Sequence, residues 1–116
     1  MIYHIAFASD WENAKEEGEY RISTKGRTLE EQGFIHGGTA HHVAPIANMI
    51  YGSDEGLVVL VIEEERLSSP LRYDEVPGWD QPFPHIYGPL NPDAVVSVLA
   101  LTRGADGKYE FTAPGE

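Results

Sequence analysis

The pattern of apolar and polar residues first predicts a strand over residues 2–8, whose sequence is IYHIAFA. Apolar residues alternate weakly there, which is typical of a strand with two unlike faces. Successive side chains of a strand point to opposite faces, so Tyr3, Ile5 and Phe7 should share one face and His4 should lie on the other. His4 is therefore expected in mid-strand, among apolar neighbours, where bonding to a nearby carbonyl is the alternative to a role in a site.

Two further runs are continuously apolar. Residues 57–62, LVVLVI, and residues 94–103, AVVSVLALTR, are typical of long strands that the rest of the protein covers on both faces. The segment ADGK at 105–108 predicts a hairpin turn into YEFT. Shorter extended segments are expected at residues 19–23, 34–36, 71–75 and 85–90.

A short helix should follow the first strand. Ser9 or Asp10 could accept the free amides of its first turn, and Gly18 should end it. Trp11 and Ala14 would form its buried stripe.

Two more helical segments lie in the first half of the chain. Residues 28–33 predict one or two turns, with Thr28 and Glu31 at the spacing of a capping box. Residues 39–52 have apolar positions at helical spacing, although Pro45 should either mark the first turn or kink the helix. Because strands outnumber helices and do not alternate with them, the pattern favours an α+β fold.

The chain has 116 residues and no cysteine, and 41% of its residues are hydrophobic. This length and composition predict a single domain over residues 1–116. Without cysteine the chain can form neither a disulfide framework nor a thiolate zinc site. Its apolar runs are far shorter than the roughly 20 residues that span a bilayer, and no signal peptide is visible. We therefore expect a cytoplasmic protein.

The net charge is −11, from 19 acidic and 8 basic residues. A field of that sign repels nucleic-acid phosphates and anionic lipids, which argues against a nucleic-acid or membrane partner. It permits a small anionic or nucleotide ligand that one or two local arginines hold. The sequence leaves the oligomeric state open.

The segment GFIHGGTAHH at 33–42 is the first candidate site. His36 ends a short extended piece, and Gly37, Gly38 and Thr39 lead into a predicted helix start. Glycines let a ligand or a backbone approach closely, and free amides at a helix start suit anions. We expect His36 in the wall of a pocket and these three residues as ligand-binding candidates.

His41 and His42 are adjacent, so on a helix they point about 100° apart and cannot chelate one ion together. The spacing argues against a metal site and favours two surface histidines outside the pocket.

The segment FPHIYGPL at 83–90 holds His85 between prolines, which would fix the orientation of its ring. Arg72 lies in the extended segment predicted at 71–75, which precedes this one, and its guanidinium is suited to bind a phosphate or carboxylate. The alternative for Arg72 is an ion pair with Glu75 or Asp74.

Several segments together resemble a known family. They are YHIA at 3–6, Trp11, GFIH at 33–36, Ile46 to Asn48 with Tyr51, LVVLVIE at 57–63, Arg72 with Glu75, and FPHIYGPL at 83–90. These segments resemble the small bacterial family catalogued as domain of unknown function 952. The resemblance covers about residues 2–102 and leaves a C-terminal hairpin and tail at 103–116.

The resemblance implies a fold of the ADP-ribosyltransferase type, a split and strongly bent sheet of mixed or antiparallel strands with a cleft between its halves and helices mainly in the N-terminal half. In that superfamily a polar residue of the first strand contacts the ribose of NAD, which is a place that His4 would take. An aromatic residue stacks on nicotinamide and an acid orients a ribose hydroxyl, roles that Tyr87 and Glu75 would fill.

One departure concerns Gly37 and Gly38, where the family pattern has cysteine or alanine followed by serine. A ligand-binding hydroxyl would then have to come from Thr39.

The leading hypothesis is a His-lined cleft for NAD or an ADP-ribose-like nucleotide, with ADP-ribosyl or phosphate transfer as its chemistry. Arg72 would hold a phosphate, and His4 and His36 would bond the ribose. His36 and His85 are the candidate catalytic residues, and His85 would serve as acid–base because histidine titrates near working pH. The alternatives are a non-catalytic small-metabolite sensor, a protein-interaction module with structural histidines, and a divalent-metal hydrolase.

Overall fold

The computed structural model of the chain describes residues 1–52 and 54–113. The strands are β1 (Ile2–Phe7), β2 (Ile22–Thr24), β3 (Arg27–Thr28), β4 (Ile35–His36), β5 (Leu57–Ile62), β6 (Leu71–Asp74), β7 (Phe83–Ile86), β8 (Val95–Ala100), β9 (Thr102–Arg103) and β10 (Tyr109–Glu110). The helices are α1 (Ala8–Glu17), α2 (Leu29–Gln32) and α3 (Ala40–Ile46), with a π-helical turn at Ala47–Tyr51 and 3₁₀ turns at Glu64–Arg66 and Pro92–Ala94. The strands of this part of the chain pair antiparallel, which confirms the α+β class.

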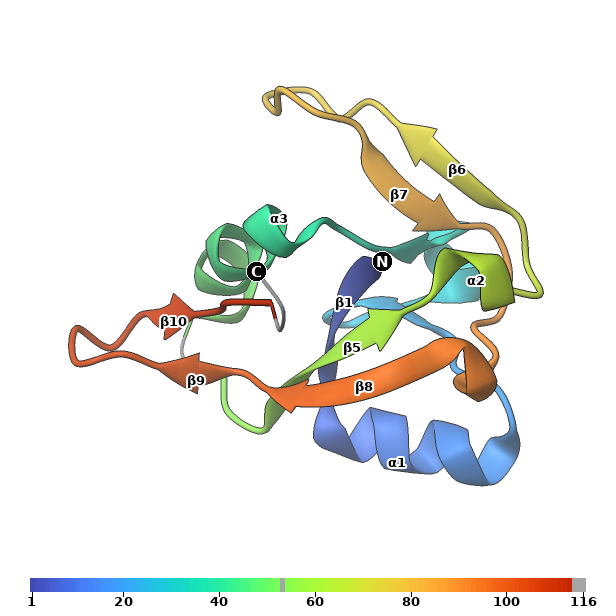
Figure 1. The fold of residues 1–116 in the computed structure, drawn as a ribbon, viewed down its shortest axis with the longest axis horizontal. Coiled ribbons are helices and arrows are strands. Elements are labelled where there is room, and N and C mark those ends of the chain that lie inside the picture. Colours follow the sequence, from blue (N-terminus) through green and yellow to red (C-terminus); the bar gives the residue numbers. More distant parts are fainter. Residues whose placement is uncertain (53, 114–116) are drawn as a thin grey trace.

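The central sheet has the order β1-β5-β8 and separates two cores (Figure 1). On one face, Ile2 and Ala6 pack with Trp11 and other residues of the α1 side. On the opposite face, Tyr3 and Ile5 pack with residues of α3 and its π-helical turn. The predicted division of β1 into two faces is therefore confirmed, as are the buried Trp11 and Ala14 of α1.

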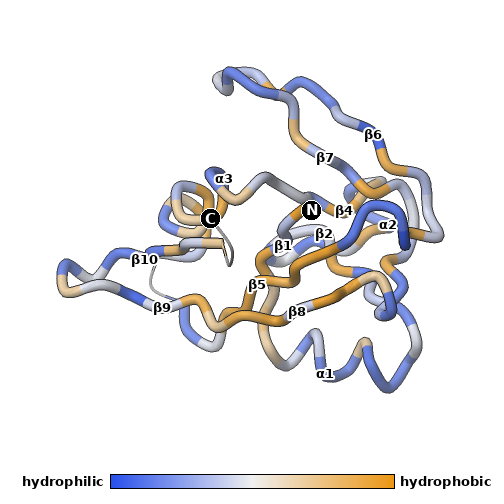
Figure 2. Tube along the Cα trace, in the orientation of Figure 1, coloured by the Kyte–Doolittle hydropathy of each residue, from blue (hydrophilic) through white to orange (hydrophobic). Residues whose placement is uncertain are grey.

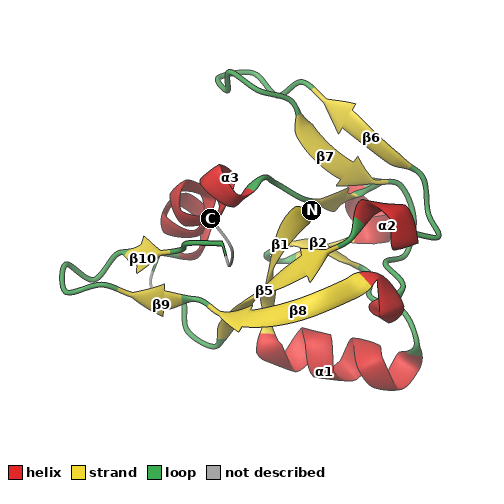
Figure 3. Cartoon of the chain, in the orientation of Figure 1, coloured by secondary structure: helices red, strands yellow, loops and turns green. Residues whose placement is uncertain are grey.

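A second sheet, of order β4-β7-β6, extends from the first core (Figure 3). Ile35 pairs with Ile86, and both are fully buried. One residue before Ile86, His85 pairs with His36 of β4 on one side and with Arg72 of β6 on the other. These three side chains therefore lie in one row, on the sheet face opposite to the buried isoleucines.

Two backbone hydrogen bonds join the two sheets. Tyr3 N–H donates to Gly38 O and Gly38 N–H donates to Tyr3 O, each over 2.9 Å. Gly37 N–H donates to Pro84 O over 2.9 Å on the other side. We call this junction of residues 3–4 with residues 36–38 the seam.

Both helix ends predicted at glycines are confirmed, but the start of α1 was wrongly predicted. Phe7 is its N-cap and no side chain caps it, so neither Ser9 nor Asp10 has that role. Strand β1 runs directly into the helix, and Ala8 N–H instead donates to Gly56 O over 2.8 Å. A backbone carbonyl brought by the β5 side thus replaces the expected side-chain cap.

The prediction that residues 94–103 form a strand covered on both faces was also wrong. Strand β8 pairs with β5 on one side, and no strand of the described residues pairs with its other side. Val96 and Val98 are each 41% exposed, although Figure 2 shows β8 to be as hydrophobic as the buried β5. Hydropathy alone cannot separate these two strands, because the difference lies in what packs beside them.

Pro45 lies inside α3 rather than in its first turn, and the helix continues as the π-helical turn Ala47–Tyr51. Proline has no N–H to donate, which disturbs the regular ladder of an α-helix. No helix of residues 1–52 and 54–113 is long and apolar enough to cross a membrane.

The capping box of α2 generates a stability prediction. Thr28 Oγ1 accepts from Glu31 N–H over 3.3 Å, and Thr28 N–H donates to Glu31 Oε1 over 3.0 Å. Thr28→Ala removes the first bond and should lower the free energy of unfolding by about 1 kcal/mol in urea denaturation. Thr102→Ala, on exposed β9, is the control; equal loss in both variants would contradict the capping role.

Candidate functional site

A cavity of about 220 Å³ opens beside the seam. Its walls are β1, residues 23–24, residues 36–38, α3 with its π-helical turn, and the loop that leads from β6 into β7. Most of the lining side chains are apolar or aromatic, and the lining includes no aspartate, glutamate, lysine or arginine. The site is thus an uncharged chamber rather than an anion cradle.

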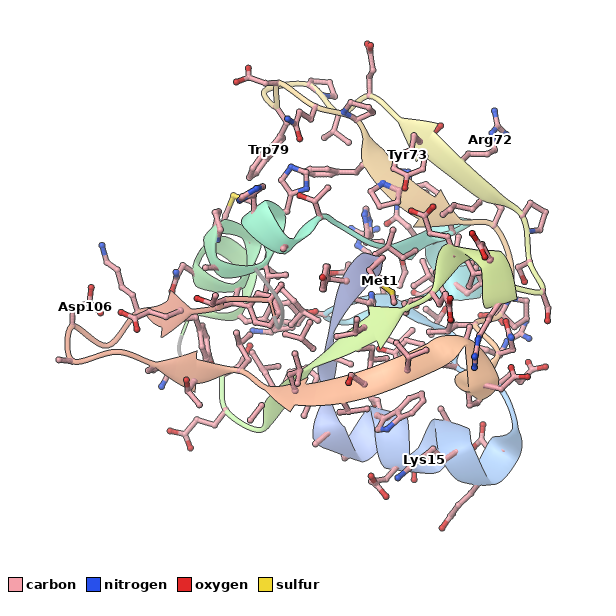
Figure 4. All side chains as sticks on the ribbon, in the orientation of Figure 1. Met1, Lys15, Arg72, Tyr73, Trp79 and Asp106 are labelled. Carbon is pink, nitrogen blue, oxygen red and sulfur yellow. The ribbon has the colours of Figure 1, made fainter. Side chains whose placement is uncertain are left out.

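Aromatic rings form one side of this chamber. The ring centroids of His42 and Phe83 are 4.2 Å apart, and Trp79 lies 5.7 Å from His42 and 5.1 Å from Phe83. Figure 4 shows Trp79 on the loop before β7, turned toward α3. Met49 is 64% exposed and lies at the cavity. Trp79 and Met49 thus place large apolar side chains at the cavity.

His42 belongs to this chamber, contrary to the expectation of a surface histidine. It is buried, and its Nδ1 accepts a hydrogen bond from Thr39 N–H over 3.2 Å. Histidine here takes the place of the Glu or Gln of a capping box, three residues after Thr39. Burial lowers the pKa of His42, which favours the neutral ring. Because Nδ1 accepts a hydrogen bond, the proton of the neutral ring is on Nε2. The three-residue spacing from Thr39 was the signal in the sequence that could have revealed this role.

His41 is exposed on α3, as predicted. Thr39 lies at the start of α3 beside the cavity, and its hydroxyl contacts His42 Nδ1 at 3.3 Å.

His4 is buried at the seam with both ring nitrogens engaged. Its Nδ1 donates to His36 O over 2.5 Å, since a carbonyl can only accept. Its Nε2 then accepts from the hydroxyl of Tyr20 over 2.8 Å. Desolvation lowers the pKa of His4 to about 4, and burial raises the pKa of Tyr20 well above its usual value. His4 therefore lines the cavity as a neutral side chain. Both of its ring nitrogens are hydrogen-bonded within the protein, so neither is free for a ligand.

Gly37 and Gly38 serve the close approach of protein backbone at the seam. A Cβ added at Gly37 would lie 3.0 Å from Pro84 O, and one added at Gly38 would lie 3.0 Å from the Cβ of His42. Both glycines also line the cavity. Gly37 therefore lets β4 approach β7 closely, and Gly38 leaves room for the His42 side chain.

A second group of predicted residues lies outside the cavity, on the outer face of the β4-β7-β6 sheet. His85 is buried, and its Nδ1 donates to Asp74 Oδ2 over 2.8 Å. Tyr87 OH donates to the same oxygen, and the Arg72 guanidinium lies 5.1 Å from the centre of the Tyr87 ring. Hydrogen bonds from Tyr87 and His85 lower the pKa of Asp74. Phe34 stacks on His85 with centroids 4.0 Å apart.

The Nε2 of His85 is buried without a hydrogen-bond partner among residues 1–52 and 54–113. The ring of His36 stands perpendicular to His85, with centroids 5.2 Å apart. Desolvation, followed by the charges of His85 and Arg27, lowers the pKa of His36 to about 4. His36 lines the cavity, so it is the residue that links the chamber to the outer group.

The predicted site residues therefore separate into two places. His4, His36, Gly37 and Gly38 line the cavity, with Thr39 next to them. Arg72, His85 and Tyr87 lie together with Asp74 on the outer face, and Glu75 is exposed after β6. Trp79 and Phe83 were missed, because a proline- and glycine-rich loop carries no periodic signal. In the described part of the chain, no three His, Asp or Glu side chains are grouped to hold a metal ion.

Comparisons with known proteins give a family and a set of related structures. A family model described as "Protein of unknown function (DUF952)" matches residues 5–98. Protein CC0527 from Caulobacter crescentus is 29% identical in its crystal structure, with a TM-score of 0.81 over 94% of this chain and 92% of that chain. Its solution NMR structure is 30% identical, with a TM-score of 0.75 over 92% and 89%. No curated protein sequence matches this chain.

The buried neutral His4 generates a prediction about pH. In the unfolded chain histidine has a pKa near 6.5, whereas the folded protein holds His4 at about 4. The unfolded state then binds more protons between these values, so stability is complete above pH 6.5 and falls as the pH drops toward 4. The free energy of unfolding lost through His4 over this whole pH range is roughly 3 kcal/mol. The lowered pKa values of His36 and His42 act in the same direction.

Urea unfolding measured from pH 8 to pH 5 should show this fall, and His4→Gln should flatten the curve. Glutamine still offers a donor for the His36 carbonyl and an acceptor for Tyr20, but it does not titrate. If the free energy of unfolding of the variant and of the natural protein changed with pH in parallel, His4 would not be the buried neutral histidine of the seam.

Proposed function

The chain belongs to the DUF952 family of proteins of unknown function, and we propose that it binds a nucleotide-type ligand of the NAD or ADP-ribose class, with a planar ring of the ligand inside the cavity. The aromatic chamber of His42, Trp79 and Phe83 carries this proposal. Planar rings stack favourably on aromatic side chains and are dehydrated at little cost in apolar surroundings.

The size of the chamber favours one ring-bearing group over a complete dinucleotide. Its volume of about 220 Å³ is below the ~300–1,000 Å³ of pockets that enclose whole drug-sized ligands. The rest of a nucleotide would therefore extend beyond the chamber.

Two neutral histidines supply polar contacts inside otherwise apolar walls. His42 Nδ1 accepts from Thr39 N–H, so the neutral ring carries its proton on Nε2 and can donate it to an acceptor on the ligand. His36 is uncharged at neutral pH and stands at the cavity wall. A heteroaromatic ring with a carbonyl or amide edge matches these groups.

The resemblance to the ADP-ribosyltransferase type of fold agrees with this ligand class. That fold has a split sheet with a cleft between its halves. The two antiparallel sheets here meet at the seam, and the cavity lies beside it. In this proposal the cavity corresponds to the nicotinamide end of the cleft, which gives His36 and Trp79 the ring contacts first assigned to Tyr87.

One observation favours a non-catalytic metabolite sensor as the second candidate. No carboxylate lines the chamber, and His85, the proposed acid–base, lies behind His36 on the outer face. Saturable binding of NAD without any product after long incubation would select the sensor over a transferase.

The ring-binding role of Trp79 can be tested directly. Trp79→Ala should weaken binding of NAD and of nicotinamide about tenfold, because the stacking surface is lost. Tyr73→Ala is the matched control, since Tyr73 is an exposed aromatic of the same hairpin that bonds Glu64 and does not line the cavity.

Amide chemical-shift titration measures both affinity and place. Shifts should gather at residues 36–38, 42–43 and 79–83. Absence of shifts at millimolar NAD, or equal affinity of the two variants, would overturn the proposal.

A further inference from the structure

A second cavity of about 130 Å³ adjoins the chamber. The two cavities share three lining residues, Ile5, Thr24 and Tyr51. The two cavities are therefore neighbours, with these side chains between them.

The second cavity is lined by charged side chains, unlike the chamber. Strands β2 and β3 are joined by a tight turn with Gly26 at φ 73°, and this turn places Lys25 and Arg27 in the cavity lining. Lys25 pairs with Asp54 over 2.5 Å. Arg27 is exposed and forms no ion pair within residues 1–52 and 54–113.

Within the described residues Arg27 has no ion pair, although its charge adds to the Thr28 hydrogen bonds that lower the pKa of Glu31. This is notable because acidic residues of the chain outnumber basic ones by 19 to 8. Most of the other arginines lie against a carboxylate or an aromatic ring. Guanidinium groups bind phosphate through paired charge-assisted hydrogen bonds, and the unpaired fork of Arg27 is free to do so.

A carboxylate completes the second cavity. Asp10 lines it together with the two cations. A carboxylate repels phosphate but accepts hydrogen bonds from sugar hydroxyls, as acidic residues do at nucleotide riboses. The cavity thus offers cations for a phosphate and an acceptor for the sugar that carries it.

We propose that the second cavity binds the ribose-phosphate part of the ligand, with Arg27 and Lys25 on the phosphate and Asp10 on a ribose hydroxyl. This subsite rests on the proposed function, because it assumes that the ring of the same ligand lies in the chamber. It also supplies the cations that the chamber lacks, in place of the distant Arg72.

Arg27→Gln tests this subsite with three probes: ADP-ribose, ribose 5-phosphate and nicotinamide. The variant should bind ADP-ribose and ribose 5-phosphate about tenfold more weakly, with less dependence on salt, because one phosphate contact is lost. Nicotinamide has no phosphate, so its affinity should not change. Arg27→Lys should recover part of the lost affinity.

Lys108→Gln is the matched control, since Lys108 is an exposed cation of the β9–β10 hairpin and lines neither cavity. Equal affinity of the Arg27 and Lys108 variants for ADP-ribose would overturn the subsite while leaving the chamber intact, provided that Trp79→Ala still weakens nicotinamide binding. If the natural protein binds none of the three probes, the proposed function fails together with the subsite.

Discussion

The pair of backbone hydrogen bonds between Tyr3 and Gly38 is the contact on which the rest of the structure depends. It joins the central sheet to the β4-β7-β6 sheet, and the bond from Gly37 to Pro84 extends the junction. Both glycine positions are tightly packed, because a Cβ at Gly37 would lie 3.0 Å from Pro84 O and one at Gly38 would lie 3.0 Å from the Cβ of His42. The seam, together with the packing of Tyr3 and Ile5 against α3 and its π-helical turn, positions the cavity walls relative to β1.

Burial of neutral histidines follows from that junction. His4 lies under the seam and stays uncharged because burial desolvates its ring and lowers its pKa to about 4, while its two nitrogens are bonded to His36 O and Tyr20 OH. His36 stays uncharged through desolvation. An interior of this kind tolerates polar side chains only in their neutral, hydrogen-bonded form. In the proposed function the chamber takes the ring of the ligand and the neighbouring β2–β3 turn takes its charged group, with Ile5, Thr24 and Tyr51 between them.

The outer group of Asp74, His85 and Tyr87 does not line the cavity but lies behind His36, which does. Asp74 fixes the His85 ring by accepting from Nδ1, and Phe34 stacks against it. These contacts form a rigid layer behind His36, which is the residue shared with the chamber. The geometry favours a supporting role for His85, which does not line the cavity.

The sequence by itself determined the features that depend on neighbours a few positions apart. The two faces of β1, the buried strand β5, the Thr28–Glu31 capping box and the placement of His36 at a cavity all follow from alternation, capping spacing or a local glycine pair. The tertiary structure alone decided that β8 lies at an edge, that Gly56 caps α1, that His4 bonds His36 and that His42 and Trp79 meet. Each of these depends on which segments, 30 or more residues apart in most cases, pack together. Local periodicity carries no information on that choice, because it is set by the summed burial and hydrogen bonding of the whole chain.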